Sequence, residues 1–394
     1  MIGCETCKEI SPLNPFSYSM PTKVIFGCDR FDELAEQCQA LGKRPFLVTG
    51  RQSAKRTGLL DRARVQLPEV VVFDEVDEDP GLKVCDRAAL KCRDAECDVV
   101  IALGGGSPMD VSKVVSALAL RSDTAAELFD DKSFQGEGLP IIAVPTTAGT
   151  GSETTPYAVI VNEEIRKKRT LRGIFPKIAL VDPRLTSTLP RHITANTGLD
   201  ALSQAMEGVV SRRSTPIGDT LALEACRILR RWLPAAVADG EDLEARSNVM
   251  YAAMLSGCVI AQSGTTLVHG MGYYFTVECN VPHGLANALL LTPVFQFDAK
   301  HVPEKVAMLA EALGYPCVPE TDVVQDAIGE AIHMLMLECG VSPAASSAGV
   351  DKTRLAEFAK DICEDASRFR NQIGTLDAEK VQQLYEASYT GYRI

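Results

Sequence analysis

The sequence has little histidine, no long apolar run and a shortage of positive charge. Its 394 residues include 40 Lys and Arg against 52 Asp and Glu, and this acidic balance argues against a nucleic-acid partner, which needs a basic face. No run of roughly 18 apolar residues occurs, which excludes a membrane-spanning helix, and we expect no membrane partner. A metal site built from imidazoles would use a large share of the five histidines, which are His192, His269, His283, His301 and His333.

The thirteen cysteines are odd in number and scattered through the chain. That distribution is typical of reduced thiols, so we expect a cytoplasmic protein without a disulfide framework. The opening residues have neither a basic start nor an apolar core, and we expect no secretory signal. Cys4 and Cys7 form a CxxC pair, but no second pair follows to complete a zinc site, and we interpret them as two thiols of the leading segment.

Short apolar runs alternate with amphipathic stretches in the first half of the chain. Runs that are apolar on both faces, with helices between them, are typical of a parallel sheet covered on both sides. The pattern therefore predicts a doubly wound α/β domain. The expected strands are 45–50, 70–73, 98–103, 140–145 and 178–182, and the clearest helices between them are 81–95 and 109–120.

The pattern changes after Pro190, where helical periodicity continues without a convincing strand. We therefore predict two domains, an α/β nucleotide-binding domain over residues 1–190 and an all-helical domain over residues 191–394. The expected helices of the second domain are 197–210, 216–237, 243–262, 304–313, 323–338, 351–365 and 377–388.

A glycine-rich turn follows the expected strand 98–103. The glycines at 104–106 allow a tight turn that brings N–H groups close to a ligand, and we expect Ser107 as the N-cap and Pro108 as the first residue of the next helix. A helix N-terminus after a strand is an anion site, commonly for pyrophosphate. Met109 stands where GxGxxG has its third glycine, so the turn alone is equally compatible with a purely structural role.

The expected strand 140–145 also leads into a small, polar loop. Residues 145–155 read PTTAGTGSETT, with five threonines, one serine and two glycines. Ligands in open α/β sheets bind outside the carboxyl ends of the strands, where both loops would lie. Two adjacent loops of this kind favour a phosphate-bearing cofactor over packing alone.

Several motifs resemble the iron-containing (group III) alcohol dehydrogenases and occur in that family's order. The resemblance implies a dehydroquinate synthase-like fold and an NAD(P)-dependent dehydrogenase for a small alcohol or aldehyde. It also implies a divalent metal, iron or zinc, that polarises the reacting oxygen, an active site between the two domains and a homodimer. The motifs are PTKVIFG at 21–27, GGGSPMDVSK at 104–113, PTTAGTGSE at 145–153, DPRLTSTLP at 182–190, TGLDALSQAMEG at 197–208 and HGMGYYFTVECNVPHGLAN at 269–287.

The resemblance places the metal ligands at Asp200, Gln204, His269 and His283. Positions 200 and 204 share one face of a helix. A continuous helix would separate the two histidines by about 21 Å, too far for one metal. We therefore expect the helix to end between them, at residues 280–282, where Asn-Val-Pro supplies the break.

Two positions depart from the family's pattern. Gln204 stands in place of a histidine ligand, and its neutral amide oxygen is a poorer donor for iron or zinc. Tyr273 stands where the family often has another histidine, four residues after His269, and we expect His269 and Tyr273 to act at the reacting oxygen. The other three histidines have no candidate ligands at the spacing of a metal site, and we interpret them as structural. They are His192, His301 and His333.

Three readings of the metal site stay open. Gln204 binds the metal directly or through water in a working site; or the site lacks metal and His269, His283 and Tyr273 stabilise the alkoxide by hydrogen bonds; or the chain binds nucleotide without catalysis. We expect the first reading and therefore an aldehyde reductase. The alternatives are the silent nucleotide-binding protein and a relative of the same fold, such as a glycerol dehydrogenase or a maleylacetate reductase.

The loop after strand 45–50 bears on the choice of nicotinamide. It opens with Gly50 and carries no acid, whereas Arg51, Ser53 and Lys55 can hold a 2′-phosphate, so we predict a preference for NADP(H) or dual use with NAD(H). A solvated basic loop is the alternative. By resemblance, the cofactor is also lined by Asp79, Gly105, Gly106, Ser107, Asp110, Thr146, Thr147, Thr150, Ser152, Thr155 and Lys168.

Overall fold

A computed structural model describes residues 15–130, 134–165 and 167–391. The chain divides into two compact units, Met20–Thr188 and Leu189–Ile394, and the second also takes in the segment that ends at Ser19. The sequence placed that leading segment in the first domain. Cys4 and Cys7 lie outside the described residues, and the eleven cysteines within them are free thiols.

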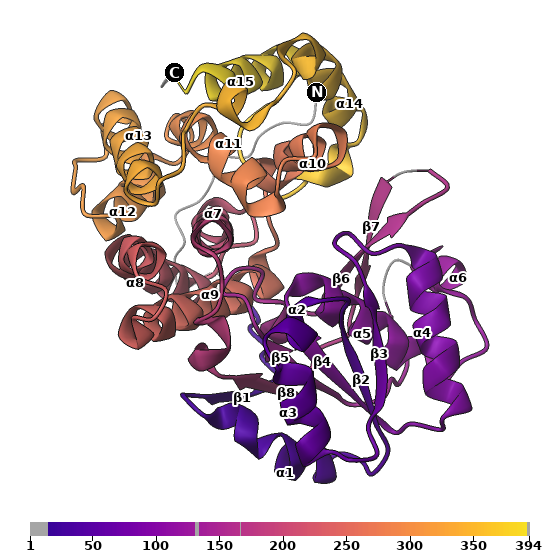
Figure 1. Ribbon diagram of the computed structural model, residues 1–394. Coiled ribbons are helices and arrows are strands. Elements are labelled where there is room, and N and C mark those ends of the chain that lie inside the picture. Colours follow the sequence, from indigo (N-terminus) through magenta and orange to yellow (C-terminus); the bar gives the residue numbers. More distant parts are fainter. Residues whose placement is uncertain (1–14, 131–133, 166, 392–394) are drawn as a thin grey trace. The chain divides into compact units, whose positions relative to one another are not determined.

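The first unit is built on a sheet of six parallel strands (Figure 1). Its spatial order is β1-β8-β5-β4-β2-β3. The chain adds β3 on one side of β2 and β4 on the other, so the strand order changes direction between β2 and β4. The register pairs Thr49 with Leu103 and Gly104 with Pro145, which brings the ends of β2, β4 and β5 to one edge. The strands are β1 (Lys23–Phe26), β2 (Pro45–Gly50), β3 (Val71–Val76), β4 (Val99–Gly104), β5 (Ile141–Pro145) and β8 (Ile178–Val181).

Helices cover both faces of this sheet, as the doubly apolar strands predicted. On one face, Phe46 and Val100 pack with α4 (Leu82–Asp94) and α5 (Gly106–Leu118), and on the other Leu47 contributes to a second core. The second core also holds buried residues of α1 (Leu34–Gln39) and α3 (Leu59–Gln66). The short helices are α2 (Ser53–Arg56) and α6 (Ala125–Asp130).

An antiparallel hairpin was not anticipated from the sequence. Strands β6 (Tyr157–Asn162) and β7 (Lys167–Arg172) form a separate two-stranded sheet. Strand β7 reads KKRTLR, and only its Leu171 is buried, so it lacks the apolar alternation that indicates a strand. The hairpin contacts α4, because the Glu163 carboxylate accepts a hydrogen bond of 3.0 Å from the backbone N–H of Leu82.

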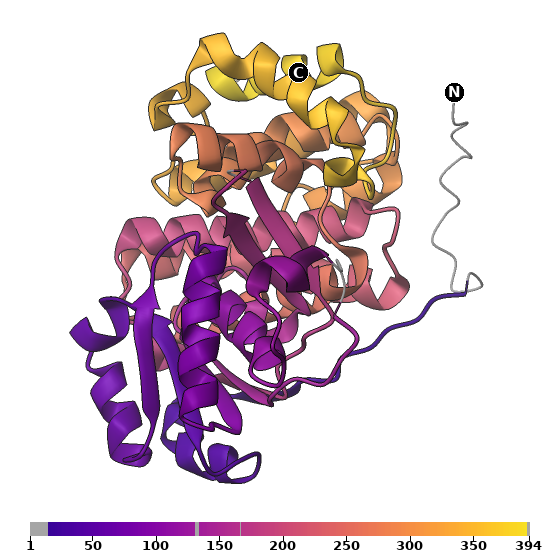
Figure 2. The ribbon, with the colours of Figure 1, turned by 90° about the vertical axis from the view of Figure 1, so that its right-hand side faces the viewer.

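The second unit is helical, and its described part from residue 191 onward contains no strand, as predicted. Figure 2 shows its helices in layers, with the pink α7–α9 on one side and the yellow α14 and α15 on the other. They are α7 (Arg191–Val210), α8 (Pro216–Ala238), α9 (Leu243–Ser263), α10 (Leu267–Cys279), α11 (His283–Asp298), α12 (Pro303–Ala312), α13 (Thr321–Glu338), α14 (Leu355–Glu364) and α15 (Ala378–Thr390).

The break between α10 and α11 lies where the sequence placed it. Helix α10 ends at Cys279, and Asn280 adopts a left-handed backbone with φ of 55°. Pro282 is the N-cap of α11, which begins at His283 itself. The two candidate ligands therefore sit on separate helices, near the beginning of each.

One local prediction was wrong. The N-cap of α5 is Gly105 and the helix begins at Gly106, so Ser107 and Pro108 lie within the first turn. The extended backbone of Gly105 supplies the cap geometry without a side-chain hydrogen bond. Pro108 is tolerated there because the N–H groups of the first turn have no helical partner.

Within the described residues, no single helix combines the length and apolar composition needed to cross a bilayer. Helices α9 and α10 meet that test only together, as a pair bent by 110°.

Candidate functional site

Helix α7 presents a stripe of polar side chains inside the helical unit. Asp200, Gln204 and Glu207 follow at intervals of four and three residues, which places them on one face of the helix. All three are buried, with at most 3% of each residue exposed. Burying two carboxylates is costly unless they meet cations or hydrogen-bond donors, so this stripe must be satisfied from neighbouring elements.

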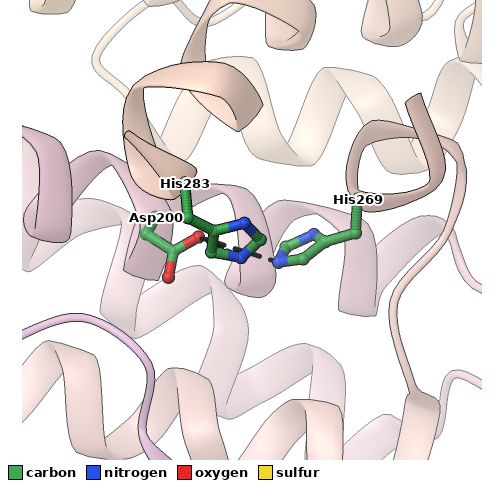
Figure 3. Close-up of side chains that lie close together, drawn as sticks. All are labelled: Asp200, His269 and His283. Carbon is green, nitrogen blue, oxygen red and sulfur yellow. Dashed lines mark ion pairs between the residues drawn. The ribbon is translucent and has the colours of Figure 1, made fainter. Parts of the chain in front are cut away.

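Two histidines face Asp200 from α10 and α11 (Figure 3). Nε2 of His269 and Nε2 of His283 each lie 3.7 Å from the same oxygen, Asp200 Oδ1. The three ligand atoms lie within 4.8 Å of one another, and the two ring centroids are 5.5 Å apart. In a metal site with bonds of about 2.1 Å, ligand atoms lie about 3.4 Å apart, so the cluster is close to coordinating spacing.

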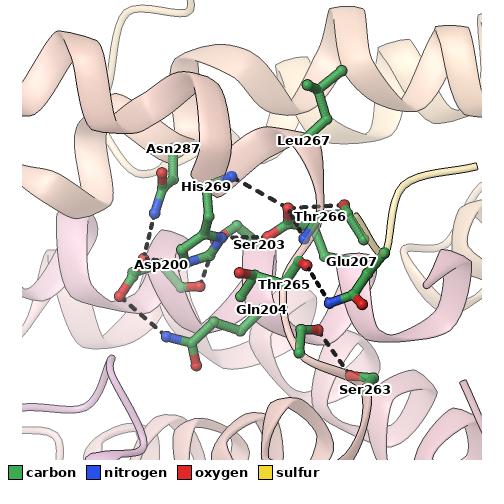
Figure 4. A network of polar contacts seen from close by, with 12 residues as sticks. Asp200, Ser203, Gln204, Glu207, Ser263, Thr265, Thr266, Leu267, His269 and Asn287 are labelled. Carbon is green, nitrogen blue, oxygen red and sulfur yellow. Dashed lines mark hydrogen bonds and ion pairs between the residues drawn. The ribbon is translucent and has the colours of Figure 1, made fainter. Parts of the chain in front are cut away.

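Glu207 fixes the orientation of His269 (Figure 4). Its Oε2 accepts a hydrogen bond from Nδ1 of His269, and its Oε1 accepts from the backbone N–H of His269 at 3.2 Å. The backbone N–H and hydroxyl of Thr266 donate to the same Oε1 at 2.8 and 2.9 Å. With its proton held on Nδ1, the ring presents an unprotonated Nε2 toward Asp200 and His283.

Gln204 and Asn287 complete the polar surroundings of Asp200. Nε2 of Gln204 donates to Asp200 Oδ2 at 3.3 Å, and Nδ2 of Asn287 donates to Asp200 Oδ1 at 2.9 Å. Nδ2 of Asn287 also lies 3.3 Å from Nε2 of His283. The amide oxygens of Gln204 and Asn287 are buried and have no hydrogen-bond partner among the described residues.

These features fit a divalent cation. Burial alone would lower the pKa of His269, but the carboxylates of Glu207 and Asp200 outweigh it and raise that pKa above its usual value. The cluster therefore attracts positive charge. The unpartnered amide oxygen of Gln204 is a neutral oxygen donor beside the cluster, and two imidazole nitrogens with a carboxylate are a donor set typical of zinc and iron.

Sequence reasoning missed Glu207 and Asn287. Both carried a signal in their spacing, because Glu207 continues the helical stripe that begins at Asp200, and Asn287 lies one turn after His283 on α11. Tyr273, which was predicted, lies one turn after His269 on α10.

The cofactor loops of the first unit contact one another. The backbone N–H of Thr146 donates to Gly104 O at 2.9 Å. A Cβ on Gly105 would lie 3.2 Å from the Thr147 hydroxyl, and one on Gly106 would lie 3.0 Å from the Thr150 methyl carbon. The close approach of the two loops therefore favours glycine at positions 105 and 106, at the edge where parallel sheets bind ligands.

A buried lysine holds these loops together. Lys113 on α5 is fully buried, and its Nζ donates to Ser152 Oγ at 2.7 Å and to Thr155 Oγ1 at 3.3 Å. Ser152 in turn donates to Asp110 Oδ1 at 2.9 Å. Desolvation lowers the pKa of Lys113 to about 8, against the opposing pull of Asp110 and Glu153. The predicted residues Asp110, Ser152 and Thr155 therefore belong to one network.

Two basic side chains of the loop after β2 already have ion-pair partners, which the sequence did not indicate. Arg51 pairs with Asp77 at 2.5 Å, and Lys55 pairs with Asp74 at 2.6 Å. Both acids come from β3 or the turn after it, so the residues of the loop directly after β2 gave no sign of these ion pairs. These pairs are exposed, and such pairs contribute only about 0–1 kcal/mol.

Two of the residues predicted to line the cofactor, Asp79 and Lys168, are neighbours in the structure. Lys168 on β7 forms an ion pair of 2.5 Å with Asp79, which adopts a left-handed backbone with φ of 49°. Asp79 lies just before α4, and the hairpin brings Lys168 to it. Asp79 and Lys168 are therefore held together as an ion pair.

Taken together, the parallel sheet with its glycine-rich and threonine-rich loops and the histidine–carboxylate cluster define a metal- and nucleotide-dependent enzyme. Comparison with known proteins agrees. Residues 21–183 match the family model for iron-containing alcohol dehydrogenase, and residues 194–389 match the C-terminal model of that family. The chain belongs to the iron-containing alcohol dehydrogenase family, and it is an NAD(P)-dependent alcohol dehydrogenase.

Similar proteins include several alcohol dehydrogenases. The chain is 33% identical over 368 residues to the 1,3-propanediol dehydrogenase of Klebsiella pneumoniae, covering 90% of this chain and 94% of that one. It is 30% identical over 375 residues to long-chain-alcohol dehydrogenase 1 of Geobacillus thermodenitrificans (strain NG80-2), covering 93% and 94%. A crystal structure of 1,3-propanediol oxidoreductase superposes with a TM-score of 0.90 at 29% identity, covering 95% and 100%.

Proposed function

We propose that this enzyme works mainly as an aldehyde reductase and binds a divalent metal, iron or zinc, through Asp200, His269 and His283. The observation that carries the proposal is the shared oxygen Asp200 Oδ1, which lies 3.7 Å from Nε2 of each histidine; Asp200 is buried, His269 is half-buried and His283 is exposed. Gln204 supplies an amide oxygen in place of a fourth charged or imidazole ligand, either directly or through water.

The side chains of the cluster have separate tasks. When bound, the metal supplies Lewis-acid polarisation of the substrate oxygen. Glu207 holds the Nδ1–H of His269, so Nε2 is the ring nitrogen that faces Asp200, and Asn287 holds Asp200 Oδ1 by a hydrogen bond. Tyr273 is positioned one turn from His269, where its hydroxyl or a water beside it can pass a proton to the forming alcohol.

We propose NADP(H) as the preferred cofactor, with NAD(H) accepted. The support is Gly50 at the end of β2, which leaves no carboxylate at this point to repel a 2′-phosphate. Arg51 and Lys55 lie next to it, and their exposed ion pairs with Asp77 and Asp74 are weak enough for a phosphate to compete.

We also propose a cytoplasmic homodimer. The free cysteines of the described chain support a reducing compartment. The dimer rests on the family resemblance alone. Light scattering coupled to size-exclusion chromatography measures the mass in solution, and a mass equal to one chain would contradict the proposed dimer.

The test of the proposed function is oxidation of NADPH by short aldehydes in the presence of Fe²⁺ or Zn²⁺. The matched variants are Asp200→Asn, which removes the shared carboxylate, and Asp239→Asn, which changes an acid outside the cluster. We expect turnover by the wild type and Asp239→Asn and its loss in Asp200→Asn. Cofactor binding without oxidation by any aldehyde would instead support a silent nucleotide-binding protein.

A further inference from the structure

An arginine of the helical unit lies against the predicted proton carrier. Arg368 belongs to the short 3-10 helix Ala366–Phe369, and its Cζ lies 3.9 Å from the ring centroid of Tyr273. It is also 5.6 Å from the ring centroid of Tyr274. The arginine side chain is only 15% exposed, so its guanidinium is held in a largely desolvated position by the two rings.

Arg368 has an ion-pair partner in Asp365, but one of its N–H donors makes no hydrogen bond to the described residues. Asp365 Oδ2 is 3.3 Å from Nε, yet the Nε–H group is buried and has no hydrogen-bond partner among the described residues. The other oxygen of Asp365 accepts hydrogen bonds from the backbone N–H and hydroxyl of Ser367. Nε is therefore the donor of Arg368 that lacks a hydrogen-bond partner among the described residues. Burying an N–H donor without a hydrogen-bond acceptor is unfavourable, and a bound anion would supply the acceptor.

The arginine lies beside the turn of α10 that carries the reaction chemistry. His269 and Tyr273 are separated by one helical turn and share a face of α10. Between them, Gly270 lets the segment of Arg368 lie close to the helix, because a Cβ at this glycine would be 2.9 Å from Arg368 O. Gly270 therefore permits the placement of a cation next to Tyr273.

We propose that Arg368 binds a carboxylate on the substrate, so that this enzyme prefers short aldehydes carrying a carboxylate a few carbons from the carbonyl. The inference rests on the proposed aldehyde reductase function and adds the substrate class. In the reaction the aldehyde takes a hydride from NAD(P)H at its carbonyl carbon and a proton at its oxygen, giving the hydroxy acid and NAD(P)⁺. The carboxylate is unchanged.

The chemistry of the group favours a carboxylate. A guanidinium presents parallel N–H donors that match the two oxygens of a carboxylate, and stacking on a ring keeps that plane oriented. The chain as a whole carries a formal charge of −12, which does not attract an anion. A local cation is therefore needed to bind an acidic substrate.

The experiment compares 4-oxobutanoate with butanal, which have the same chain length and differ in the carboxylate. For each protein, the readout is the ratio of kcat/KM for 4-oxobutanoate to that for butanal. We expect a ratio above about 10 for the wild type, and a fall of about tenfold or more in Arg368→Gln, carried mainly by KM for the acid. Arg368→Lys keeps the charge without the planar fork, and its ratio should lie between the two.

The control is Arg370→Gln, which removes an exposed positive charge two residues away and should keep the wild-type ratio. A ratio near 1 in the wild type, or an unchanged ratio in Arg368→Gln, overturns the proposal while leaving aldehyde reduction intact. If butanal and 4-oxobutanoate both fail with every protein, the proposed function itself fails. A melting temperature measured for each variant separates loss of folding from loss of binding, because a purely structural arginine would lower stability without changing the ratio.

Discussion

The carboxylate of Glu207 accepts the Nδ1–H of His269 and so fixes which ring nitrogen faces Asp200. Glu207 is fully buried, and its other oxygen is held by Thr266 and by the backbone of His269. A neutral imidazole with a defined tautomer is the form that binds metal, and a carboxylate partner also increases its basicity. This pair therefore determines how well His269 serves as a ligand.

Replacing Glu207 by Gln should weaken metal retention by about 10- to 100-fold, because the amide no longer supports the Nδ1–H tautomer. The measurement is metal affinity by competition with a chelator. Glu224→Gln is the matched control, since Glu224 is about half exposed and its ion-pair partner within the described residues is Arg227, one turn along α8. Equal affinities for wild type and Glu207→Gln would show that Glu207 has only a packing role.

Gln204→His should increase metal affinity by about tenfold or more, because imidazole nitrogen is a better donor than an amide oxygen for zinc or iron. The position faces Asp200 from one turn along α7, and its amide oxygen is already unpartnered. The same chelator competition measures the effect. An affinity equal to or below that of the wild type would mean that position 204 does not reach the metal.

Much of this site could be predicted from the sequence, and the reasons differ by residue. His269 and His283 were predicted to converge because Asn280 and Pro282 break the helix between them, and both residues do so. Asn287 lies at regular helical spacing from His283, but spacing alone does not distinguish it from other polar residues of buried helices. Its role depends on the approach of α11 to α7, which only the packing reveals.

The fold shows the same limits. The doubly apolar strands predicted the parallel sheet, because buried strands need apolar residues on both faces. Strand β7 was missed, since four of its six residues are charged and Leu171 alone is buried. The partners of Arg51 and Lys55 were also missed, because Asp77 and Asp74 come from β3 and the following turn, about 20 residues later in the chain.

Gly50→Asp should lower the ratio of kcat/KM for NADPH to that for NADH by about tenfold or more, because a carboxylate there repels the 2′-phosphate and can bind a free 2′-hydroxyl. The site has room, since a Cβ on Gly50 would meet only Val76 O at 3.6 Å. Steady-state kinetics with both cofactors measure the ratio. A wild type that already prefers NADH would contradict the proposed cofactor preference, and an unchanged ratio would place the 2′ position elsewhere.

Glu153 should make folding stability depend on pH. Desolvation raises its pKa from 4.5 to about 7, so between these values the folded state keeps a proton that the unfolded state has released. The free energy of unfolding should therefore fall as pH rises from 4.5 to 7, by up to about 3 kcal/mol. In Glu153→Gln this contribution disappears. Denaturant unfolding of both proteins from pH 5 to 8 measures the difference, and parallel curves would show that Glu153 does not titrate in this range.

The most direct test of the metal site is the stoichiometry of bound metal. Wild type and Asp200→Asn are purified without chelator, equilibrated with Fe²⁺ under anaerobic conditions or with Zn²⁺, freed of excess ion and analysed by mass spectrometry of the elements. The account predicts about one ion per wild-type chain and almost none in Asp200→Asn, because the shared carboxylate is lost. A wild type that retains no metal, or an Asp200→Asn protein that retains as much as the wild type, would contradict it.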